Sequence, residues 1–260
     1  MNEPSSNGRT LAFVVTLCFT AALILSVLAS ALKVPQEEAK EIFRSKQLLI
    51  AAHILDFEGK FISTGKMASH EEILSTYQTD ITPMLVTEKG DLFTFAAAGL
   101  DEPSYLQTHA KQGYSKLTYK LIYVIKQGGY VIPINGYGLW DAIYGYLGIG
   151  KNGDTVIGMS WYDQKETPGL GGEIANPDWE EQFYGKVIFQ KNSDGTTNYA
   201  RSPLGIQVVK GSVIEMLGTT PAADSAVDGI SGATITVTGV NSAIKNSLAP
   251  YRNFLLKVQR

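Results

Sequence analysis

The chain has 260 residues, of which 44% are hydrophobic and 18% are charged, and its formal net charge is -3 at pH 7. This composition is typical of a globular protein of one or two domains and excludes a largely disordered chain. The negative charge and the lack of any Lys/Arg run argue against a nucleic-acid partner, because binding to phosphates draws on clustered positive charge.

Residues 11–32 form an apolar segment without a charged residue, a proline or a glycine. A helix needs about 20 such residues to cross a bilayer, so we expect an uncleaved transmembrane helix. A cleavable signal peptide is the alternative, because small residues stand near the end of the segment, but the run exceeds the usual signal core of about 7–15 residues. The segment has no ionisable group with which to carry ions, and its hydroxyls can bond back to the helix backbone (Thr16, Thr20, Ser26 and Ser30).

The charges that flank this segment bear on its orientation. Arg9 precedes it, and four basic residues follow it within a short distance: Lys33, Lys40, Arg44 and Lys46. Counted alone, they weakly favour a cytoplasmic carboxyl-terminal domain. The sole cysteine, Cys18, lies within the segment, so no intramolecular disulfide is possible.

Beyond the segment, the pattern predicts an α+β domain. A helix is expected over residues 36–52, with Pro35 near its start. Hairpins are expected over residues 84–95, about Lys89-Gly90, and over residues 117–134, about Gly128-Gly129. Further strands are expected over residues 155–162 and 186–190, in a return after residues 192–195, and over residues 205–209.

Helices are expected at three further places. Residues 176–185 have Asn176 as an N-cap, Pro177 at the first helical position and Gly185 past the end. Residues 138–148 are a weaker helical candidate. The last helix is expected to begin after Thr238 or Gly239, because Val240, Ile244 and Leu248 recur at a four-residue step. Pro250 should end it and leave residues 251–258 as a separate helix.

Familiar catalytic patterns do not appear in the sequence. The three histidines (His53, His70 and His109) lack the close spacing of a zinc site, and no G-x-S-x-G nucleophile motif is present. The stretch "GIGKNG" at 148–153 leads into a predicted strand, so an ordinary turn is favoured over a phosphate loop. We therefore predict no catalytic residue and no metal ligand.

Two glycine-rich stretches are candidates for binding a flat ligand. "NGYGLW" at 135–140 places Tyr137 and Trp140 beside glycines that allow close backbone approach. "KETPGLGGEI" at 165–174 combines one proline with three glycines, which is unlike a regular helix or strand. From the residues alone, ordinary turns remain the alternative for both.

The stretch "DGISGATITVTGV" at 228–240 places small residues just before the last predicted helix. Free N–H groups and the helix dipole favour an anion at such a point, and a phosphate is the natural guest for an accessible Thr234. From these residues alone, an ordinary turn into a helix is the better interpretation.

Taken in order, the apolar segment, "NGYGLWDAIYGYLG", "ETPGLGGEI", "NPDWEEQFYGK" and "DGISGATITVTGVNSAI" resemble the C subunit of the sodium-translocating NADH:quinone oxidoreductase. The resemblance runs from "NGRTLAFV" nearly to the carboxyl terminus. It extends less closely to the G subunit of a related, ferredoxin-linked electron-transport complex, which shares the "ETPGLG" and "SGAT" patterns.

The resemblance implies that Thr234 carries FMN through a phosphoester bond, made from FAD and Mg²⁺ by a separate flavin transferase. It implies that the transferase reads a signature around that residue: Asp228, Gly229, Ser231, Gly232 and Ala233. It further implies that two loops pack around the flavin ring, through Glu166, Thr167, Gly169, Leu170, Gly138, Leu139 and Trp140. Many relatives have a histidine shortly before "ETPGLG", where Asp163, Gln164 and Lys165 stand here.

The expected organisation is a tail (1–10), a transmembrane helix (11–32), a juxtamembrane helix (33–55) and an extracytoplasmic FMN-binding domain (56–260) with an antiparallel-rich sheet and flanking helices. The resemblance implies an electron carrier that relays electrons between redox centres of neighbouring subunits, in a bacterial inner membrane with the FMN domain on the periplasmic side. That placement opposes the weak Lys/Arg count. A membrane-anchored binding domain without flavin is the alternative of a different class.

Overall fold

The computed structural model describes residues 6–259, so residues 1–5 of the expected tail lie outside the described residues. The chain divides into two compact units, Met1–Phe43 and Arg44–Arg260, and each is considered by itself. The described part therefore consists of an amino-terminal unit that is helical and a second unit that holds every strand.

The described residues of the amino-terminal unit, 6–43, lie within a single helix, α1 (Ser6–Ala51), which continues into the second unit. The expected new helix at residue 36 is therefore wrong in its start, because α1 runs through Pro35. A proline removes one i to i−4 hydrogen bond, and the long helical runs on both sides of Pro35 tolerate that single loss. Thr16 and Thr20 donate their hydroxyls to the carbonyls of Ala12 (2.9 Å) and Thr16 (3.0 Å), as predicted.

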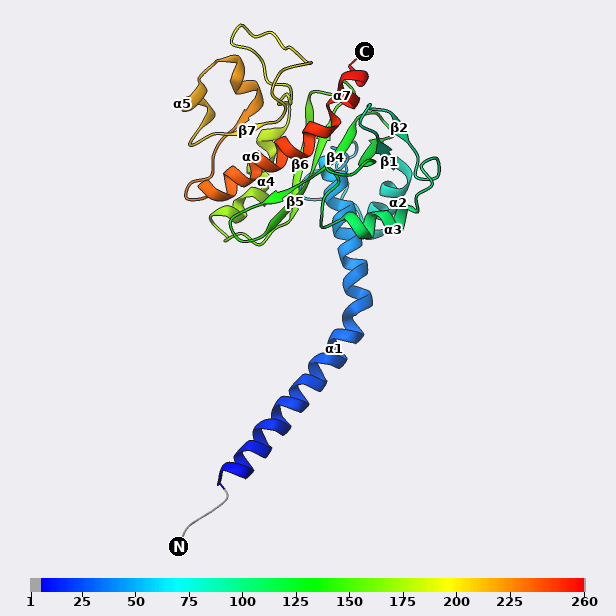
Figure 1. The fold of residues 1–260 in the computed structure, drawn as a ribbon, viewed down its shortest axis with the longest axis vertical. Helices are drawn as coiled ribbons and strands as arrows, with labels where there is room; N and C mark the ends of the chain where they lie inside the picture. The colour runs from blue at the N-terminus through cyan, green and yellow to red at the C-terminus, as the bar shows by residue number, and fades with distance from the viewer. Residues whose placement is uncertain (1–5, 260) are drawn as a thin grey trace. The chain divides into compact units, whose positions relative to one another are not determined.

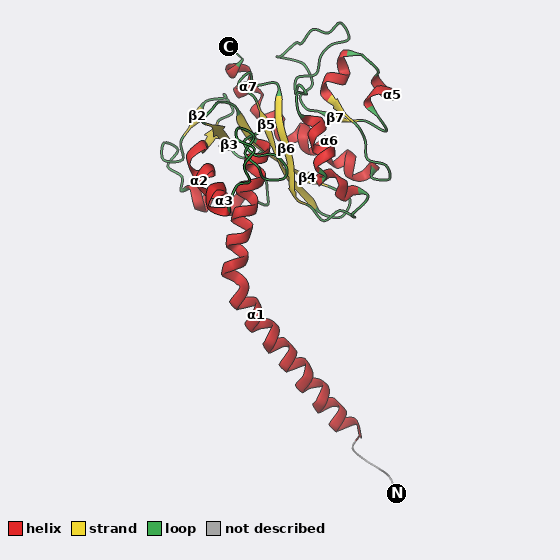
Figure 2. Cartoon of the chain, turned by 180° about the vertical axis from the view of Figure 1, so that it is seen from behind, coloured by secondary structure: helices red, strands yellow, loops and turns green. Residues whose placement is uncertain are grey.

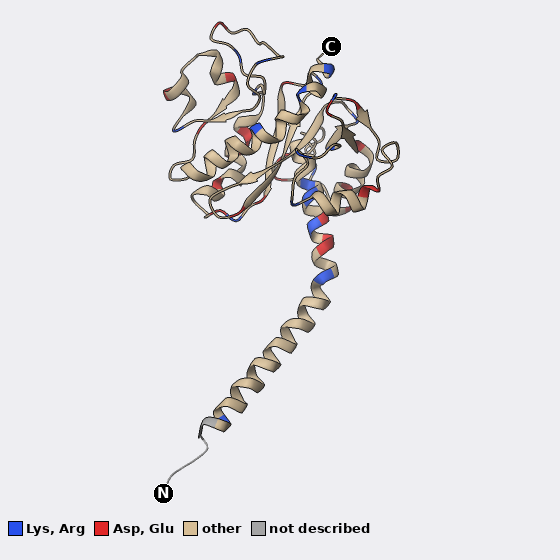
Figure 3. Ribbon diagram, viewed as in Figure 1, with Lys and Arg blue, Asp and Glu red and all other residues tan. Residues whose placement is uncertain are grey.

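Among residues 6–259, α1 is the one helix long and apolar enough to cross a membrane, by length and composition. Figure 3 shows charged residues of α1 near its beginning and in its later part, with an uncharged stretch between them.

The second unit is built on a six-stranded antiparallel sheet of order β2-β1-β3-β4-β5-β6. Figure 2 draws the strands in yellow. Its strands are β1 (Ile81–Val86), β2 (Leu92–Phe93), β3 (Lys120–Ile125), β4 (Tyr130–Tyr137), β5 (Ala142–Ile149) and β6 (Val156–Asp163). Both predicted hairpins are confirmed, with Leu85 paired to Phe93 and Tyr123 to Val131. Gly128 and Gly129 have φ of 99° and 112° in the second turn, a backbone region that favours glycine.

The helix considered for residues 138–148 is wrong, because most of that stretch forms β5. Leu147 of β5 pairs with Ile132 of β4 on one side and with Met159 of β6 on the other. A short apolar run that contains glycines does not distinguish a buried strand from a helix by its period. The two neighbouring strands decide the outcome here.

The last helix begins earlier than expected. α6 spans Thr234–Leu248, so Thr234 is its first residue rather than part of a preceding loop. The β-branched residues 234–238 have only modest helix propensity, but Thr236 and Val237 are buried and extend the packed face by one turn. A 3-10 turn, η4 (Ala249–Tyr251), and α7 (Arg252–Val258) follow, as the proline predicted.

The predicted punctuation of residues 176–185 is confirmed: Asn176 caps α4 (Pro177–Glu180), the turn η2 (Glu181–Phe183) follows, and Gly185 has φ of 78°. The strands expected between residues 186 and 209 are mostly absent from the described chain. Isolated bridges, Thr155 to Val187 and Phe189 to Leu204, replace them. The short parallel pair of β7 (Gln207–Val208) and β8 (Ala226–Val227) completes this region.

Several further elements were not anticipated by the sequence pattern. They are α2 (His70–Asp80), α3 (Glu102–His109), η1 (Gly171–Ala175), α5 (Val213–Leu217) and η3 (Pro221–Ser225). Ser69 forms a capping box at the start of α2, and Ser212 forms one at the start of α5.

The sheet of the second unit has a core on each face. One core packs the sheet against α4, α6 and α7, and the other packs it against the end of α1, α2 and α3. In Figure 1, α6 lies along the sheet beside β4. A Cβ at Gly148 of β5 would lie 1.8 Å from the carbonyl oxygen of Ala51, so glycine lets the sheet contact the last turn of α1 directly.

Candidate cofactor site

Three segments far apart in the sequence meet at one end of the sheet. The turn 138–141 connects β4 to β5, the loop 164–170 follows β6, and residues 228–233 lead into α6. β4 and β6 are each antiparallel to β5, so their carboxyl ends lie at the same end of the sheet. The two glycine-rich stretches are therefore neighbours in space, and Gly232 of the third segment lies against Leu170.

Glu166 connects these segments. Its side chain is only 5% exposed, and its two carboxylate oxygens accept the N–H groups of Leu139 (3.0 Å) and Trp140 (2.9 Å). The hydroxyl of Thr236, in the first turn of α6, donates to the same carboxylate. One buried anion therefore fixes the β4–β5 turn, the loop after β6 and the start of α6.

The hydrogen bonds of Glu166 also set its ionisation. Burial by itself raises the pKa of this carboxyl group, but the bonds from Thr236 and from the amides of Trp140 and Leu139 outweigh burial and hold the pKa below its ordinary value. Glu166 is therefore a carboxylate at neutral pH.

Two glycines leave room for this carboxylate. A Cβ at Gly138 would lie 2.5 Å from Oε1 of Glu166, and a Cβ at Gly171 would lie 2.4 Å from Oγ1 of Thr236. Such distances are too short for any side chain. Gly138 and Gly171 are thus required by packing around Glu166 and Thr236.

The position of α6 depends on its close contact with β4. A Cβ at Gly239 would lie 2.0 Å from the carbonyl oxygen of Tyr137, and a Cβ at Gly136 would lie 2.5 Å from Cβ of Ala243. Farther along the helix, the amide of Asn135 donates to Oγ of Ser247 (3.1 Å). This contact holds the first turn of α6 at the end of the sheet.

Thr234 is exposed at the first position of α6. The preceding residue, Ala233, is buried and offers no side-chain cap, so no side chain of the described chain accepts the amides that open the helix. Uncapped amides and the positive end of the helix dipole favour an anion at this point. Ser231 and Gly232 are exposed beside it.

Apolar side chains are exposed around the same place. The exposed fractions are 76% for Tyr137, 69% for Trp140, 59% for Ile235, 50% for Leu139 and 43% for Leu170. Nε1 of Trp140 donates to Oγ1 of Thr167 (3.1 Å), which orients the indole. A Cβ at Gly232 would lie 2.8 Å from Leu170, so the loop after β6 contacts the start of α6.

Gly169 orders the same loop. It has φ of 76°, and its amide donates to Oε1 of Glu173 (2.9 Å). The carbonyl of Thr167 accepts the amides of Leu170 (3.1 Å) and Gly172 (2.9 Å). The loop therefore has a defined shape.

Asp228 and Gly229 have structural contacts of their own. The amide of Asp228 donates to Gln182 (2.9 Å), its carbonyl accepts Nε1 of Trp179 (2.9 Å), and Oδ1 accepts the amide of Val213 (2.6 Å). A Cβ at Gly229 would lie 2.2 Å from the carbonyl oxygen of Val209. This half of the motif anchors the approach to α6, whereas Ser231, Gly232 and Thr234 are exposed.

The residues just before "ETPGLG" make local contacts. Lys165 pairs with Asp141, and the side chain of Gln164 accepts the amide of Glu166 (2.6 Å). Both contacts support the turn and the loop that Glu166 joins. Sequence reasoning missed Thr236, and the only signal for it was its place two residues after Thr234.

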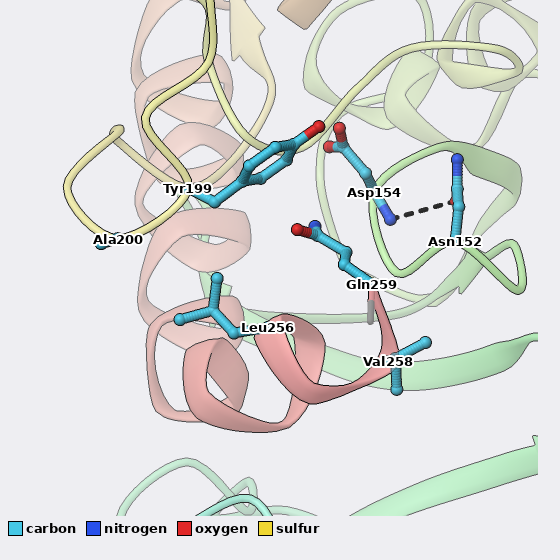
Figure 4. Close-up of a pocket in the computed structure, with 7 residues that line it drawn as sticks. All are labelled: Asn152, Asp154, Tyr199, Ala200, Leu256, Val258 and Gln259. Carbon is cyan, nitrogen blue, oxygen red and sulfur yellow. Dashed lines mark hydrogen bonds between the residues drawn. The ribbon is translucent and has the colours of Figure 1, made fainter.

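A separate cavity of about 580 Å³ lies near the carboxyl terminus, lined by Asn152, Asp154, Tyr199, Ala200, Leu256, Val258 and Gln259 (Figure 4). It shares no residue with the cluster around Glu166. Among residues 6–259, no group of three His, Cys, Asp or Glu side chains is placed to hold a metal ion.

Comparison with known proteins identifies the family. Residues 138–249 match the model of the FMN-binding domain family. The C subunit of the Na(+)-translocating NADH-quinone reductase of Chlamydia caviae is 39% identical, over 94% of this chain and 91% of its own length. The chain belongs to this C-subunit family. A Vibrio campbellii relative of the same name is 31% identical, over 96% of this chain and 95% of its own.

Solved structures agree with this membership. The crystal structure of the C subunit from Parabacteroides distasonis matches with a TM-score of 0.61 and 28% identity, covering 86% of this chain and 96% of that one. The structure of NqrC from Shewanella oneidensis, at 23% identity and a TM-score of 0.57, shares the fold and covers 85% of this chain and 99% of its own. The match to the FMN-binding domain spans all three segments joined by Glu166.

The residues of the site fit FMN. Its phosphate suits the uncapped amides at the start of α6, and its flat ring system suits the exposed Trp140, Tyr137 and Leu170. Ser231, Gly232 and Ala233 place no large side chain beside Thr234. This end of the sheet can thus accommodate a phosphate and a ring on different elements.

Proposed function

We propose that Thr234 carries FMN through a phosphoester bond and that the chain relays electrons between redox centres of neighbouring subunits in a sodium-translocating NADH:quinone oxidoreductase. The observation that carries this proposal is the exposed Thr234 at the uncapped start of α6, two residues before Thr236, which donates to Glu166. When bound, FMN supplies one- and two-electron redox chemistry.

A flavin transferase makes the bond in this proposal. The phosphoanhydride of FAD breaks, the FMN phosphorus bonds to Oγ1 of Thr234, and AMP leaves while the hydroxyl loses its proton. Exposure of Thr234, Ser231 and Gly232 supports access by such an enzyme. Asp228 and Gly229 support it differently, because their contacts fix the loop that presents the hydroxyl.

In this proposal the turn 138–141 and the loop 164–170 contact the flavin ring. Glu166 orients the amides of Leu139 and Trp140, and the Trp140 bond to Thr167 sets the indole. We propose that Gly138, Gly169 and Leu170 complete this side, which excludes water from one face of the ring. Covalent attachment keeps the local concentration of the flavin independent of any free pool, which a relay between subunits requires.

Other subunits supply the rest of the reaction. The apolar segment of α1 has no ionisable group, so sodium movement belongs to partner subunits. We propose that α1 anchors the chain in a bacterial inner membrane with the FMN domain on the periplasmic side, where free FMN is scarce and tethering is most useful. The weak Lys/Arg asymmetry beside a single span is soft evidence against this orientation.

The comparisons bear on both alternatives. Relatives at 31–39% identity carry the name of the C subunit, which favours that family over the ferredoxin-linked G subunit. A match to the FMN-binding domain disfavours an anchored domain without flavin.

A denaturing gel tests the proposal. The full chain is produced with and without an active flavin transferase, and the gel is viewed for flavin fluorescence. We expect a fluorescent band that co-migrates with the chain only when the transferase is present. No band in either sample would contradict covalent attachment.

A further inference from the structure

A second cavity lies beside the edge strand β6, where α1 ends, and shares no lining residue with the Glu166 site. Its volume is about 330 Å³, within the range of small-ligand pockets. Much of its wall is apolar, formed by residues such as Ile50, Leu55, Ile157 and Met159. All its lining residues belong to the second compact unit.

His53 lines this cavity in an unusual backbone conformation. Its φ is 56°, and among residues 6–259 it is the one residue other than glycine with a positive φ. It ends α1: its amide donates to Ile50 (2.9 Å), and the amide of Ile54 donates to Leu49 (2.9 Å). Glycine is the usual residue at such a helix end. A histidine at this position costs backbone energy, because its φ is positive.

The imidazole of His53 contacts Tyr184, with ring centroids 4.8 Å apart. Burial lowers the pKa of His53, so the ring is mainly neutral at pH 7. Tyr184 is 55% exposed and His53 is exposed as well, so this pair of rings lies where the cavity meets solvent.

Glu180 of α4 is the buried polar group of the same cavity. It is 4% exposed, and one of its carboxyl oxygens accepts the amide of Trp161. Its other oxygen has no hydrogen-bond partner in the described chain. Burial raises the pKa of Glu180 to about 8, outweighing the bond from Trp161. At neutral pH the group is therefore mainly a carboxylic acid whose O–H has no acceptor.

The remaining polar groups define what the cavity rejects. Asp56 and Glu181 also line it, and no described lysine or arginine does, so an anion is disfavoured. Oδ1 of Asp56 already accepts the amides of Gly59 (2.8 Å) and Lys60 (2.7 Å). Glu181 is exposed, so the buried polar group left for a ligand is the neutral O–H donor of Glu180, with the neutral imidazole of the exposed His53 beside the apolar wall.

We propose that this cavity binds an uncharged, flat ring compound that carries a carbonyl oxygen, with Glu180 donating to that oxygen and His53 packing against the ring. A neutral acid in an apolar site is suited to such a bond, because it donates without bringing a charge into the cavity. A cation is the less favoured guest, since it would have to lose its water beside apolar side chains.

The test uses the full-length chain in detergent, produced without flavin transferase, and follows the methyl resonance of Met159 by NMR. Three bicyclic probes share one body: tetralone carries a carbonyl, tetralin lacks it, and aminotetralin carries an ammonium. Met216, exposed on α5, reports non-specific effects. We expect tetralone to shift Met159 alone and to bind about tenfold more tightly than tetralin, as loss of one hydrogen bond implies.

Two variants of Glu180 test whether the hydrogen-bond donor, and not the apolar wall alone, determines the affinity for tetralone. Glu180→Met removes the donor at similar volume, and we expect it to weaken tetralone about tenfold without affecting tetralin. Glu180→Gln keeps an N–H donor, so its affinity should remain close to that of the unaltered chain, which also controls for folding. Tighter binding of aminotetralin, equal binding of tetralone and tetralin, or no shift of Met159 with tetralone would each overturn the proposal.

Discussion

Among the individual residues, a buried anion that the sequence did not identify as central organises the site. Glu166 belongs to a motif expected to contact the flavin ring, yet its oxygens are used by Leu139, Trp140 and Thr236. Thr236 is 70 positions away along the chain. A partnership over such a distance leaves no local pattern, so only the fold shows that Glu166 fixes the site.

Replacing Glu166 by Gln should destabilise the full chain by about 2 kcal/mol at pH 7, because hydrogen bonds to a charged group contribute about 1.5–3 kcal/mol. The folded-state pKa of Glu166 is lowered, so its contribution is present above the unfolded-state pKa and is lost as pH falls through the folded-state pKa. The difference between the two proteins should therefore shrink in acid. Denaturant unfolding at several pH values measures it, and a pH-independent difference would contradict the role of the carboxylate.

The pH dependence of stability that comes from Glu180 should have the opposite sign to that from Glu166. Its folded-state pKa, about 8, lies above the unfolded value, so the stability of the unaltered chain should fall as pH rises from about 4.5 to about 8. Glu180→Gln should remove this dependence and stabilise the chain at pH 8 by a few kcal/mol, on the order of the linkage for a strongly shifted group. Thermal unfolding at pH 5 and pH 8 provides the comparison. An equal or lower melting temperature of the variant at pH 8 would count against a buried neutral acid.

Among the helices and strands, the contact between α6 and β4 positions Thr234. The sequence predicted α6 from Val240, Ile244 and Leu248 but placed its start too late, because residues 234–238 are poor helix formers whose burial is decided by the sheet. The strand β5 was misread for a related reason: its pairing partners, not its own period, determine it. The hairpins were predictable, since their turns carry local glycine signals.

Gly239→Ala tests this contact, because we expect it to destabilise the chain, the opposite of its usual effect in a helix. In a helix interior, Ala is normally more stable than Gly by about 0.5–1 kcal/mol. At Gly239 the added Cβ would lie 2.0 Å from the carbonyl oxygen of Tyr137, so we expect a loss of about 2 kcal/mol and less flavin attachment. Ser242→Ala, on an exposed position of the same helix, is the matched control and should change little. A stabilised Gly239→Ala protein would show that α6 does not need this approach.

For the molecule as a whole, the order of motifs predicted the family and the sequence pattern predicted the α+β domain, and both are confirmed. The helix α1 is long and apolar enough to be the expected anchor. The sequence could not predict the cavity at the end of α1. Its parts come from α1, the loop after it, β6 and α4, and the positive φ of His53 leaves no mark in composition.

Membrane topology gives a prediction for the entire chain. Cys18 is the only cysteine and lies in the apolar segment, so Thr219→Cys adds a single exposed reporter in the second unit. In intact cells whose outer membrane has been made permeable, a membrane-impermeant maleimide should label this variant. Unaltered protein should remain unlabelled. Labelling only after the inner membrane is broken would place the domain in the cytoplasm.

Mass spectrometry of the full chain, purified after co-expression with an active flavin transferase, tests covalent flavin attachment most directly. We expect a mass increase of one FMN less one water, located by peptide mapping on Thr234. The increase should vanish in Thr234→Ala and persist in Thr238→Ala, an exposed threonine one turn along α6. An unmodified chain, or an FMN that persists in Thr234→Ala, would contradict attachment at Thr234.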